Sequence, residues 1–324
     1  MKPFFRTHRD LIGLTGVLCA VFLVMWGLNP DRFVTTNNLR SMSFQLPEIG
    51  ILTLGMMVAM LHGGINLSIV GLANLTGITV ALVLHSISPQ GAGTDAGWFN
   101  GLLGVIAGFC VSLAVGFLQG VLIGFAGVSA ILATLGTMTL VNGACVLITH
   151  GSTLTGFPNT ILFLGNGSLG VVPIPLLLFL VCAVLLSVLL RRTTFGFSVY
   201  MLGTNQEATK FAGMNNRLVL LKVYLLSSVL ASIAGLVMMG RFNSVKADYG
   251  QSYLLVTVLA AVLGGTSASG GFGKVLGVVL AVIMLQLIAS GLNLLGVDPF
   301  FAIATWGVIL LIVMALNHFL RPGA

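Results

Sequence analysis

The feature that most constrains this chain is a long stretch without basic residues. Residues 41–190 contain no Lys or Arg and only two acidic residues, Glu48 and Asp95. A membrane-spanning helix needs about 20 mainly apolar residues, so this stretch alone has room for about five crossings. In the whole chain only 6% of residues are charged, and the mean hydropathy is +1.10. Such a chain cannot cover a globule with solvated side chains, which excludes a soluble enzyme.

Breaks at charges, at prolines and at clusters of Gly, Asn and Ser divide the chain into about ten apolar segments. The predicted spans are residues 11–28, 46–61, 65–86, 101–125, 129–149, 171–190, 218–240, 252–267, 274–292 and 299–317. Several are short, which favours broken or re-entrant segments. The predicted fold is an all-α integral membrane protein, with residues 1–324 forming a single transmembrane domain.

The distribution of basic residues predicts the orientation in the membrane. Most of the 14 Lys and Arg fall on one side of the predicted spans, and the exceptions are Arg32, Arg40, Arg241 and Lys246. Because basic residues are enriched on the cytoplasmic side, we expect both termini in the cytoplasm and the loops 87–100 and 150–170 outside. This asymmetry also explains the net charge of +7. No stretch interleaves basic and aromatic residues as a nucleic-acid surface would, so no nucleic-acid partner is expected.

Residues 191–217 form the one substantial polar stretch that this orientation assigns to the cytoplasm. At its centre, Asn205 is placed to cap a short helix, Glu207 lies in the first turn, and Gly213 is placed to end it. A short helix lying along the membrane face is the expected structure. It is either an ordinary interfacial loop with a turn of helix or a docking element for another protein.

Three motifs carry a resemblance to a known family. Glu207-Ala208-Thr209 followed by Gly213 resembles the Glu-Ala-Ala-x-x-x-Gly motif of the membrane subunits of bacterial ABC importers, with Thr209 in place of the second Ala. The sequence Gly-Gly-Ile-Asn-Leu-Ser at 63–68 resembles the Gly-Gly-Ile-Asp-Leu-Ser signature of the ribose/xylose-type permeases, with Asn66 in place of Asp. The glycine-rich stretches within 263–271 and 291–296 are similar to the C-terminal half of these permeases. The chain is therefore identified as a member of the branched-chain amino acid/sugar permease superfamily.

The resemblance implies a transport subunit of the bacterial plasma (inner) membrane rather than an enzyme. The implied partners are membrane lipid, a twin-domain ABC ATPase, a second permease copy in a homo- or heterodimer, and a periplasmic solute-binding protein. In such importers a cytoplasmic helix fits a cleft of the ATPase and passes its closure to the spans. The residues that match this coupling element are Glu207, Ala208, Thr209 and Gly213.

Polar residues inside spans are costly in hydrocarbon unless they face a partner or water, so they mark either interhelical hydrogen bonds or a translocation path. The amide side chains in the predicted spans carry no charge. Together they indicate a conduit for a neutral, hydroxyl-rich solute. With the residues of the permease signature, the candidates for the translocation path are Gly63, Gly64, Asn66, Ser68, Asn74, Gln119, Asn142, Gln286 and Asn293.

Other classes of function need acidic, histidine or metal-ligating groups at positions where the sequence does not have them. No acidic residue is expected deep in a span, and His62, His85 and His150 lie near predicted span ends, which argues against an ion-coupled secondary transporter. No cluster of acids, His or Cys has metal-ligand spacing, so neither a metal, a cofactor nor a membrane enzyme is expected. The predicted function is the permease subunit of an ABC importer for a neutral sugar or similar small polar solute. The alternatives are nucleoside or branched-chain amino acid import by the same type of permease, and ion-coupled transport.

The predicted span 101–125 also carries small residues at every fourth position, which lets helix backbones approach closely in lipid. These residues are Gly104, Gly108, Ser112, Gly116, Gly120 and Gly124. The pattern predicts tight packing, or alternatively a smooth face along which helices slide.

Overall fold

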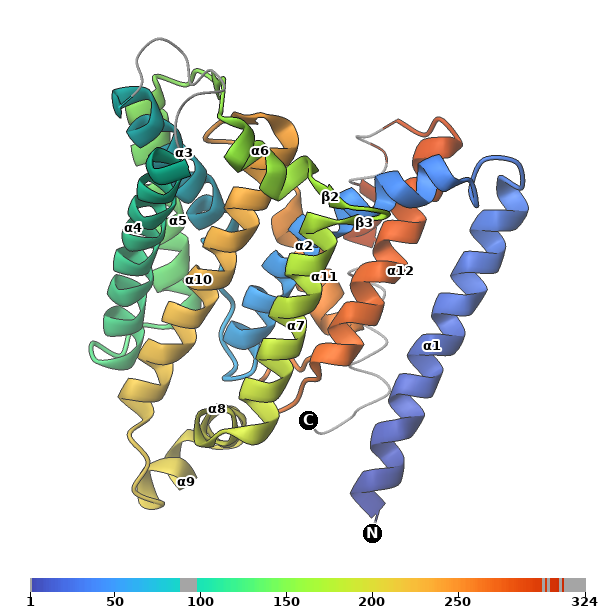
Figure 1. Cartoon of the computed structure of the whole chain (residues 1–324). Coiled ribbons are helices and arrows are strands. Elements are labelled where there is room, and N and C mark those ends of the chain that lie inside the picture. Colours follow the sequence, from blue (N-terminus) through green and yellow to red (C-terminus); the bar gives the residue numbers. More distant parts are fainter. Residues whose placement is uncertain (1, 88–97, 299–300, 302–303, 309–310, 312–324) are drawn as a thin grey trace.

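The structure is a computed structural model that describes residues 2–87, 98–298, 301, 304–308 and 311, with residues 2–10 described by their backbone alone (Figure 1). The helices are α1 Lys2–Leu28, α2 Thr36–Met60, α3 Ile69–Ile87, α4 Trp98–Gly124, α5 Ala130–Thr149, α6 Asn159–Asn166, α7 Ile174–Arg192, α8 Thr194–Thr204, α9 Gln206–Phe211, α10 Asn216–Phe242, α11 Tyr253–Leu263 and α12 Val275–Leu294. Two antiparallel pairs of short strands join β1 (Leu154–Thr155) to β4 (Ser244–Val245) and β2 (Ser168–Leu169) to β3 (Val172–Pro173).

Within the described part of the chain, eight helices are long and apolar enough to cross a membrane: α1, α2, α3, α4, α5, α7, α10 and α12. Each coincides with a predicted span, which confirms an all-α membrane protein. The predicted span 252–267 is the shorter apolar helix α11, and most of the predicted span 299–317 lies outside the described residues. The total of ten crossings therefore stays a prediction.

Two elements differ from the sequence-based map. Helix α2 begins at Thr36 rather than at 46, because Thr35 caps it by accepting a hydrogen bond from the Asn38 amide and because Pro47 is accommodated within the helix. The polar stretch 191–217 holds two helices, α8 and α9, where one was expected. Thr193 accepts a hydrogen bond from the Gly196 amide and so starts α8 directly after α7.

The small residues of α4 pack against other helices, as predicted. The upper part of the row faces α3, where a Cβ on Gly108 would lie 3.0 Å from the Thr76 carbonyl oxygen. The lower part faces α10, where a Cβ on Gly120 would lie 2.8 Å from Cα of Leu221. Because backbone fills this space, the row is a close helix contact and has no room for larger side chains.

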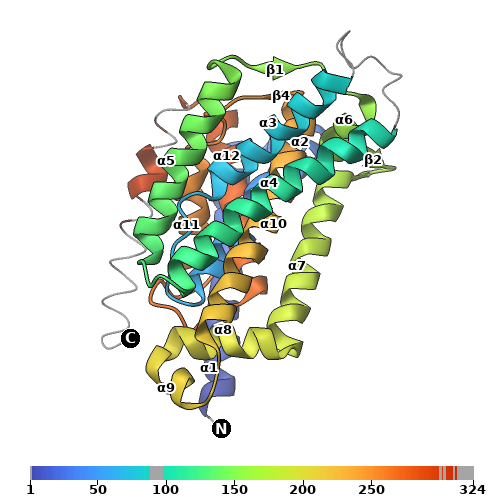
Figure 2. The same ribbon diagram turned by 90° about the vertical axis from the view of Figure 1, so that its left-hand side faces the viewer.

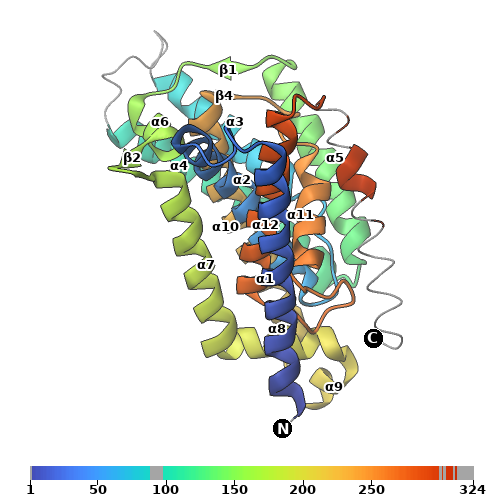
Figure 3. The same cartoon turned by 90° about the vertical axis from the view of Figure 1, so that its right-hand side faces the viewer.

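Helix α10 crosses the middle of the molecule and packs against α2, α3, α4 and α6, whereas α1 lies at the periphery (Figures 1 and 3). The side chains of Phe22 and Met25 on α1 pack around Leu287 of α12 and around Phe33 and Met42 near the start of α2. These contacts lie toward one end of α1, and its remaining described surface is exposed. The central helices thus form the packed body of the protein.

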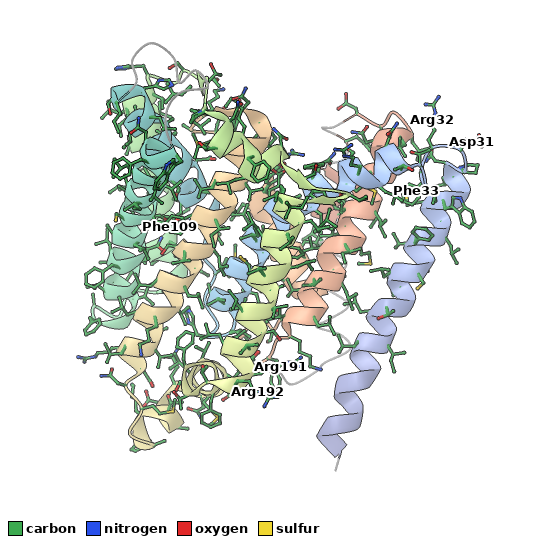
Figure 4. The ribbon with its side chains drawn as sticks, in the orientation of Figure 1. Asp31, Arg32, Phe33, Phe109, Arg191 and Arg192 are labelled. Carbon is green, nitrogen blue, oxygen red and sulfur yellow. The ribbon has the colours of Figure 1, made fainter. Side chains whose placement is uncertain are left out.

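The two ends of the helix bundle differ. Arg191 and Arg192 end α7 at the same end of the molecule as α8, α9 and the start of α1, while Asp31 and Arg32 lie at the opposite end (Figure 4). That opposite end is covered by α6 and the two strand pairs, where Asn166 donates a 2.8 Å hydrogen bond to the Gly240 carbonyl (Figure 2). The arrangement agrees with the predicted separation of basic residues, and the direction in which the bundle is inserted stays a prediction.

Candidate functional site

Helix α9 is a short, well-capped element at the end of the bundle (Figure 2). The side-chain oxygen of Asn205 accepts hydrogen bonds from the amides of Glu207 (3.0 Å) and Ala208 (2.9 Å), which confirms the predicted N-cap. At the other end, Gly213 has a φ of 76° and its amide donates to the Lys210 carbonyl, while the Met214 amide donates to the Thr209 carbonyl. This pair of bonds is a Schellman motif, so α9 is held in one conformation by caps at both ends.

The residues of the motif do not all face outward. Glu207 is exposed and forms a surface ion pair of 2.7 Å with Lys210, whereas Thr209 is buried and donates to the Gln206 carbonyl. Phe211, two residues after Thr209, is 90% exposed. The sequence motif did not single out Phe211, although an aromatic residue in a polar loop is a signal for a contact surface.

Helix α8 carries α9 and lies across the end of the bundle, where it meets two loops at backbone distance. The first loop, 61–68, joins α2 to α3, and the second, 264–274, joins α11 to α12. A Cβ on Gly203 of α8 would collide with the Leu61 carbonyl oxygen and with the amide nitrogen of Gly271. These two groups are themselves hydrogen-bonded at 2.8 Å. Tyr200 of α8 adds a 2.8 Å hydrogen bond to the Gly273 carbonyl.

We call this meeting point of Gly203 with the loops 61–68 and 264–274 the glycine junction. Gly63 belongs to it, since a Cβ on Gly63 would lie 3.0 Å from the Ser269 carbonyl oxygen, whereas a Cβ on Gly64 would meet the His62 ring and the Tyr224 hydroxyl. Gly270 has a φ of 92°, a conformation that favours glycine, and a Cβ there would lie 2.7 Å from the Gly63 amide nitrogen. Helix α8 and the two loops therefore contact each other mainly through backbone atoms, with few side-chain atoms between them.

The rest of the permease signature is buried in a polar network next to the junction. The Asn66 amide donates to the Ser227 hydroxyl at 2.9 Å, and its oxygen accepts from the Ser68 hydroxyl at 2.7 Å. Gln119 of α4 donates to the Ser68 hydroxyl, and the Ser227 hydroxyl donates to the Gly55 carbonyl. The structure thus joins three of the predicted path residues, Asn66, Ser68 and Gln119, in one network that links α2, α3, α4 and α10.

The other predicted path residues lie apart from this network. Asn74 donates to the carbonyls of Ala247 and Tyr249 and so fixes the segment that follows β4. Asn142 lies against α3, where a Cβ on Gly71 would be 3.0 Å from its side-chain oxygen. Gln286 donates a 3.3 Å hydrogen bond to Gln45, and Asn293 is exposed near the end of α12. The set does not line one continuous surface in this structure.

The expectation that no acidic residue lies deep in a span was wrong. Glu48 lies in the middle of α2 and is 1% exposed, because Arg241 at the end of α10 forms a 2.9 Å ion pair with it and Tyr253 donates a 3.0 Å hydrogen bond. His62 lies just past the end of α2, as predicted, but it is buried and hydrogen-bonded to the Tyr224 hydroxyl at 3.1 Å. In both cases the partner comes from a distant part of the sequence, which no local pattern reveals.

Comparisons with known proteins agree with these motifs. A family described as branched-chain amino acid transport system / permease component matches residues 38–316. The ribose import permease protein RbsC of Escherichia coli is 32% identical over 98% of this chain and 95% of its own length, and that of Bacillus subtilis is 31% identical over 90% and 87%. The D-allose transport system permease protein AlsC of Escherichia coli is 28% identical over 98% and 94%. No solved structure matches. The chain belongs to the family of permease components of the branched-chain amino acid transport system type, and it is a multi-pass membrane transport subunit.

Proposed function

We propose that this chain is the permease subunit of an ATP-binding cassette importer that moves a monosaccharide across the bacterial plasma membrane. The relatives named above are permeases for ribose and allose, and an L-arabinose permease of Escherichia coli is 27% identical over 94% of the chain. The observation that carries the mechanism is α9, a rigidly capped helix that projects from the end of the bundle and is attached through α8 to the glycine junction.

In this proposal Glu207, Ala208, Thr209 and Gly213 form the coupling element for a twin-domain ATPase. Three of these residues have separate tasks in the structure. Glu207 offers a carboxylate at the surface, Thr209 packs inward, and Gly213 supplies the left-handed turn that ends the helix. Phe211 adds an exposed apolar side chain that can enter a pocket of the partner, where burying it would contribute about 1.5–3 kcal/mol.

The glycine junction gives the movement of α9 a short route into the membrane. A ligand-driven change needs an element whose positions the partner prefers differently. Helix α8 contacts the loops 61–68 and 264–274 through backbone atoms. A shift of α8 therefore displaces the ends of α2, α11 and α12, because few side chains lie between them to absorb the movement. The network around Asn66 ties the same end of α2 to α3, α4 and α10.

The translocation path is proposed to draw on the residues singled out from the sequence: Gly63, Gly64, Asn66, Ser68, Asn74, Gln119, Asn142, Gln286 and Asn293. Import by such a subunit also requires a second permease copy, identical or related, and a periplasmic solute-binding protein. The uncharged amides among these residues suit a neutral solute better than an ion.

The test is transport by the complete importer. The chain is co-reconstituted into proteoliposomes with the ATPase and binding protein encoded beside it, and uptake of labelled D-ribose, D-allose, L-arabinose, leucine and adenosine is measured. The proposal predicts ATP-dependent uptake of at least one of the three sugars. Uptake of leucine or adenosine alone would replace the sugar by one of the alternatives, and uptake driven by an ion gradient without ATP would contradict the proposal.

A further inference from the structure

A small cavity lies between α2, α11 and α12 beside Glu48. Its volume is about 190 Å³, which corresponds to about six water molecules at ~30 Å³ each. That is the size of one sugar ring with its hydroxyls and is below the range of drug-sized ligand pockets. The polar residues in its wall are Gln45, Glu48, Ser252, Tyr253 and Gln286, and Trp306 contributes an aromatic ring.

The carboxylate of Glu48 is only half satisfied. Its Oε1 takes both the ion pair with Arg241 and the hydrogen bond from Tyr253. Its Oε2 is buried and accepts no hydrogen bond from any residue that the structure describes. A buried carboxylate oxygen without a donor is costly, and a hydroxyl donor in the cavity would remove that cost.

The other wall residues suit the same kind of ligand. The Gln286–Gln45 bond, at 3.3 Å, is longer than an ordinary hydrogen bond, so a solute hydroxyl can replace it at little cost. Both amides can donate and accept, as hydroxyls do. Trp306 is part of the wall, and an aromatic ring can pack against the C–H side of a sugar ring. Arg241 balances the charge of Glu48, so the site as a whole carries no net charge and favours a neutral solute over an ion.

The cavity is also mechanically connected to the coupling element. Its walls come from α2, α11 and α12, and each of these helices ends or begins at one of the two loops that meet Gly203 of α8. A displacement of α8 would reach the cavity through the bodies of these three helices. This is the arrangement needed for a site whose affinity changes with the state of the ATPase.

We propose that this cavity binds one neutral, hydroxyl-rich solute of monosaccharide size, with Glu48 Oε2 accepting a hydroxyl hydrogen and the amides of Gln45 and Gln286 completing the polar contacts. The assignment rests on the proposed import of a monosaccharide and gives the permease a solute site of its own. Of the path residues predicted from sequence, Gln286 lines this cavity.

The three tryptophans of the chain permit a direct test. Trp26 and Trp98 are exposed and lie outside the cavity wall, so the W26F/W98F variant reports fluorescence from Trp306 alone. The purified full-length variant is titrated with D-ribose, D-allose and L-arabinose, with maltose as an oversized control and NaCl as an ion control. We expect a saturable change with at least one monosaccharide and none with maltose or NaCl.

Two substitutions in this background then locate the site. Glu48→Gln removes the charged acceptor and is expected to weaken sugar binding about tenfold or more. Gln286→Leu leaves the ion pair with Arg241 intact, so it tests the site even if the loss of Glu48 impairs folding. Leu276→Ala, on the same helix but exposed and outside the cavity wall, is the control and should bind as the parent does.

The outcomes separate this inference from the proposed function. Loss of the sugar response in Glu48→Gln or Gln286→Leu, with Leu276→Ala unchanged, supports the cavity site. A response that is equal in all variants, a response to NaCl, or ATP-driven sugar uptake with no fluorescence response to that sugar overturns it. The last result would leave the importer itself standing, because uptake is measured independently.

Discussion

Position 203 has room for a hydrogen atom and for nothing larger, because the Leu61 carbonyl and the Gly271 amide occupy the space of a side chain. Gly203→Ala should push α8 away from the two loops. Overpacking of this kind costs about 1–3 kcal/mol, and the variant should lose most sugar uptake while still binding the ATPase through α9. Gly143→Ala on α5, where a Cβ meets nothing within 4 Å, is the control. Normal uptake by Gly203→Ala, measured at equal protein level, would show that the glycine junction does not transmit movement.

Phe211 is the side chain of α9 with the most to gain from a partner, since it is 90% exposed in the isolated chain. Phe211→Ala should weaken ATPase binding by about 1.5–3 kcal/mol, which is roughly a ten- to hundredfold loss of affinity. Co-purification of the ATPase and a titration by surface plasmon resonance measure this. Phe197→Ala removes an exposed ring from α8 and serves as the matched control. Equal loss in both variants would mean that the contact is not specific to α9.

The close packing of helix α4 against α10 can be tested by the same kind of substitution. A Leu at Gly120 would have to displace the backbone of α10 at Leu221, so Gly120→Leu should lower the yield of folded protein and its thermal midpoint. Gly136→Leu on α5 is the control, because a Cβ at Gly136 meets nothing within 4 Å. Size-exclusion profiles and a thermal-shift assay on both variants provide the readout. A stable Gly120→Leu protein with normal transport would place this face against lipid.

Long apolar helices could be located from the sequence because the length of a hydrophobic run is a local property. Short elements such as α8 could not. Helix α8 has apolar residues such as Val199 and Leu202 but follows two arginines, so its sequence looked like part of a polar loop. The start of α2 was missed because Pro47 and Glu48 look like a boundary. Only the fold brings Arg241 to Glu48 and makes a charge inside that helix tolerable.

In the candidate site, too, local features could be predicted from the sequence and contacts between distant residues could not. The caps of α9 were predicted because Asn205 and Gly213 act on neighbouring backbone. The glycine junction was not, since it joins residues near 61, 203 and 271 that are adjacent only in the folded chain. Of the nine path residues, four came from the permease signature and five were chosen for polarity in apolar segments, and neither criterion says which of them meet.

The arrangement of the whole molecule predicts which end of the helix bundle faces which side of the membrane. The end that carries α8 and α9 should face the cytoplasm, and the end that carries α6 and the strand pairs should face outward (Figure 1). In a variant lacking Cys19, Cys110, Cys145 and Cys182, single cysteines at exposed positions of 150–170 should react with an impermeant maleimide in intact cells. Cysteines at exposed positions of 203–213 should react only after permeabilisation. The reverse pattern would place α9 outside the cell, on the side of the membrane opposite to ATP hydrolysis.

The measurement that tests the central claim most directly follows ATPase co-purification and sugar uptake in two variants of α9. Gly213→Pro fixes φ near −65° and removes the amide that donates to Lys210, so it should uncouple uptake from ATP hydrolysis while the protein still inserts. Glu207→Ala removes a charge available for the partner and should weaken ATPase binding by about 2 kcal/mol, or tens-fold. The account predicts loss of uptake in the first and loss of ATPase binding in the second. Full ATPase binding together with full uptake in both variants would contradict it.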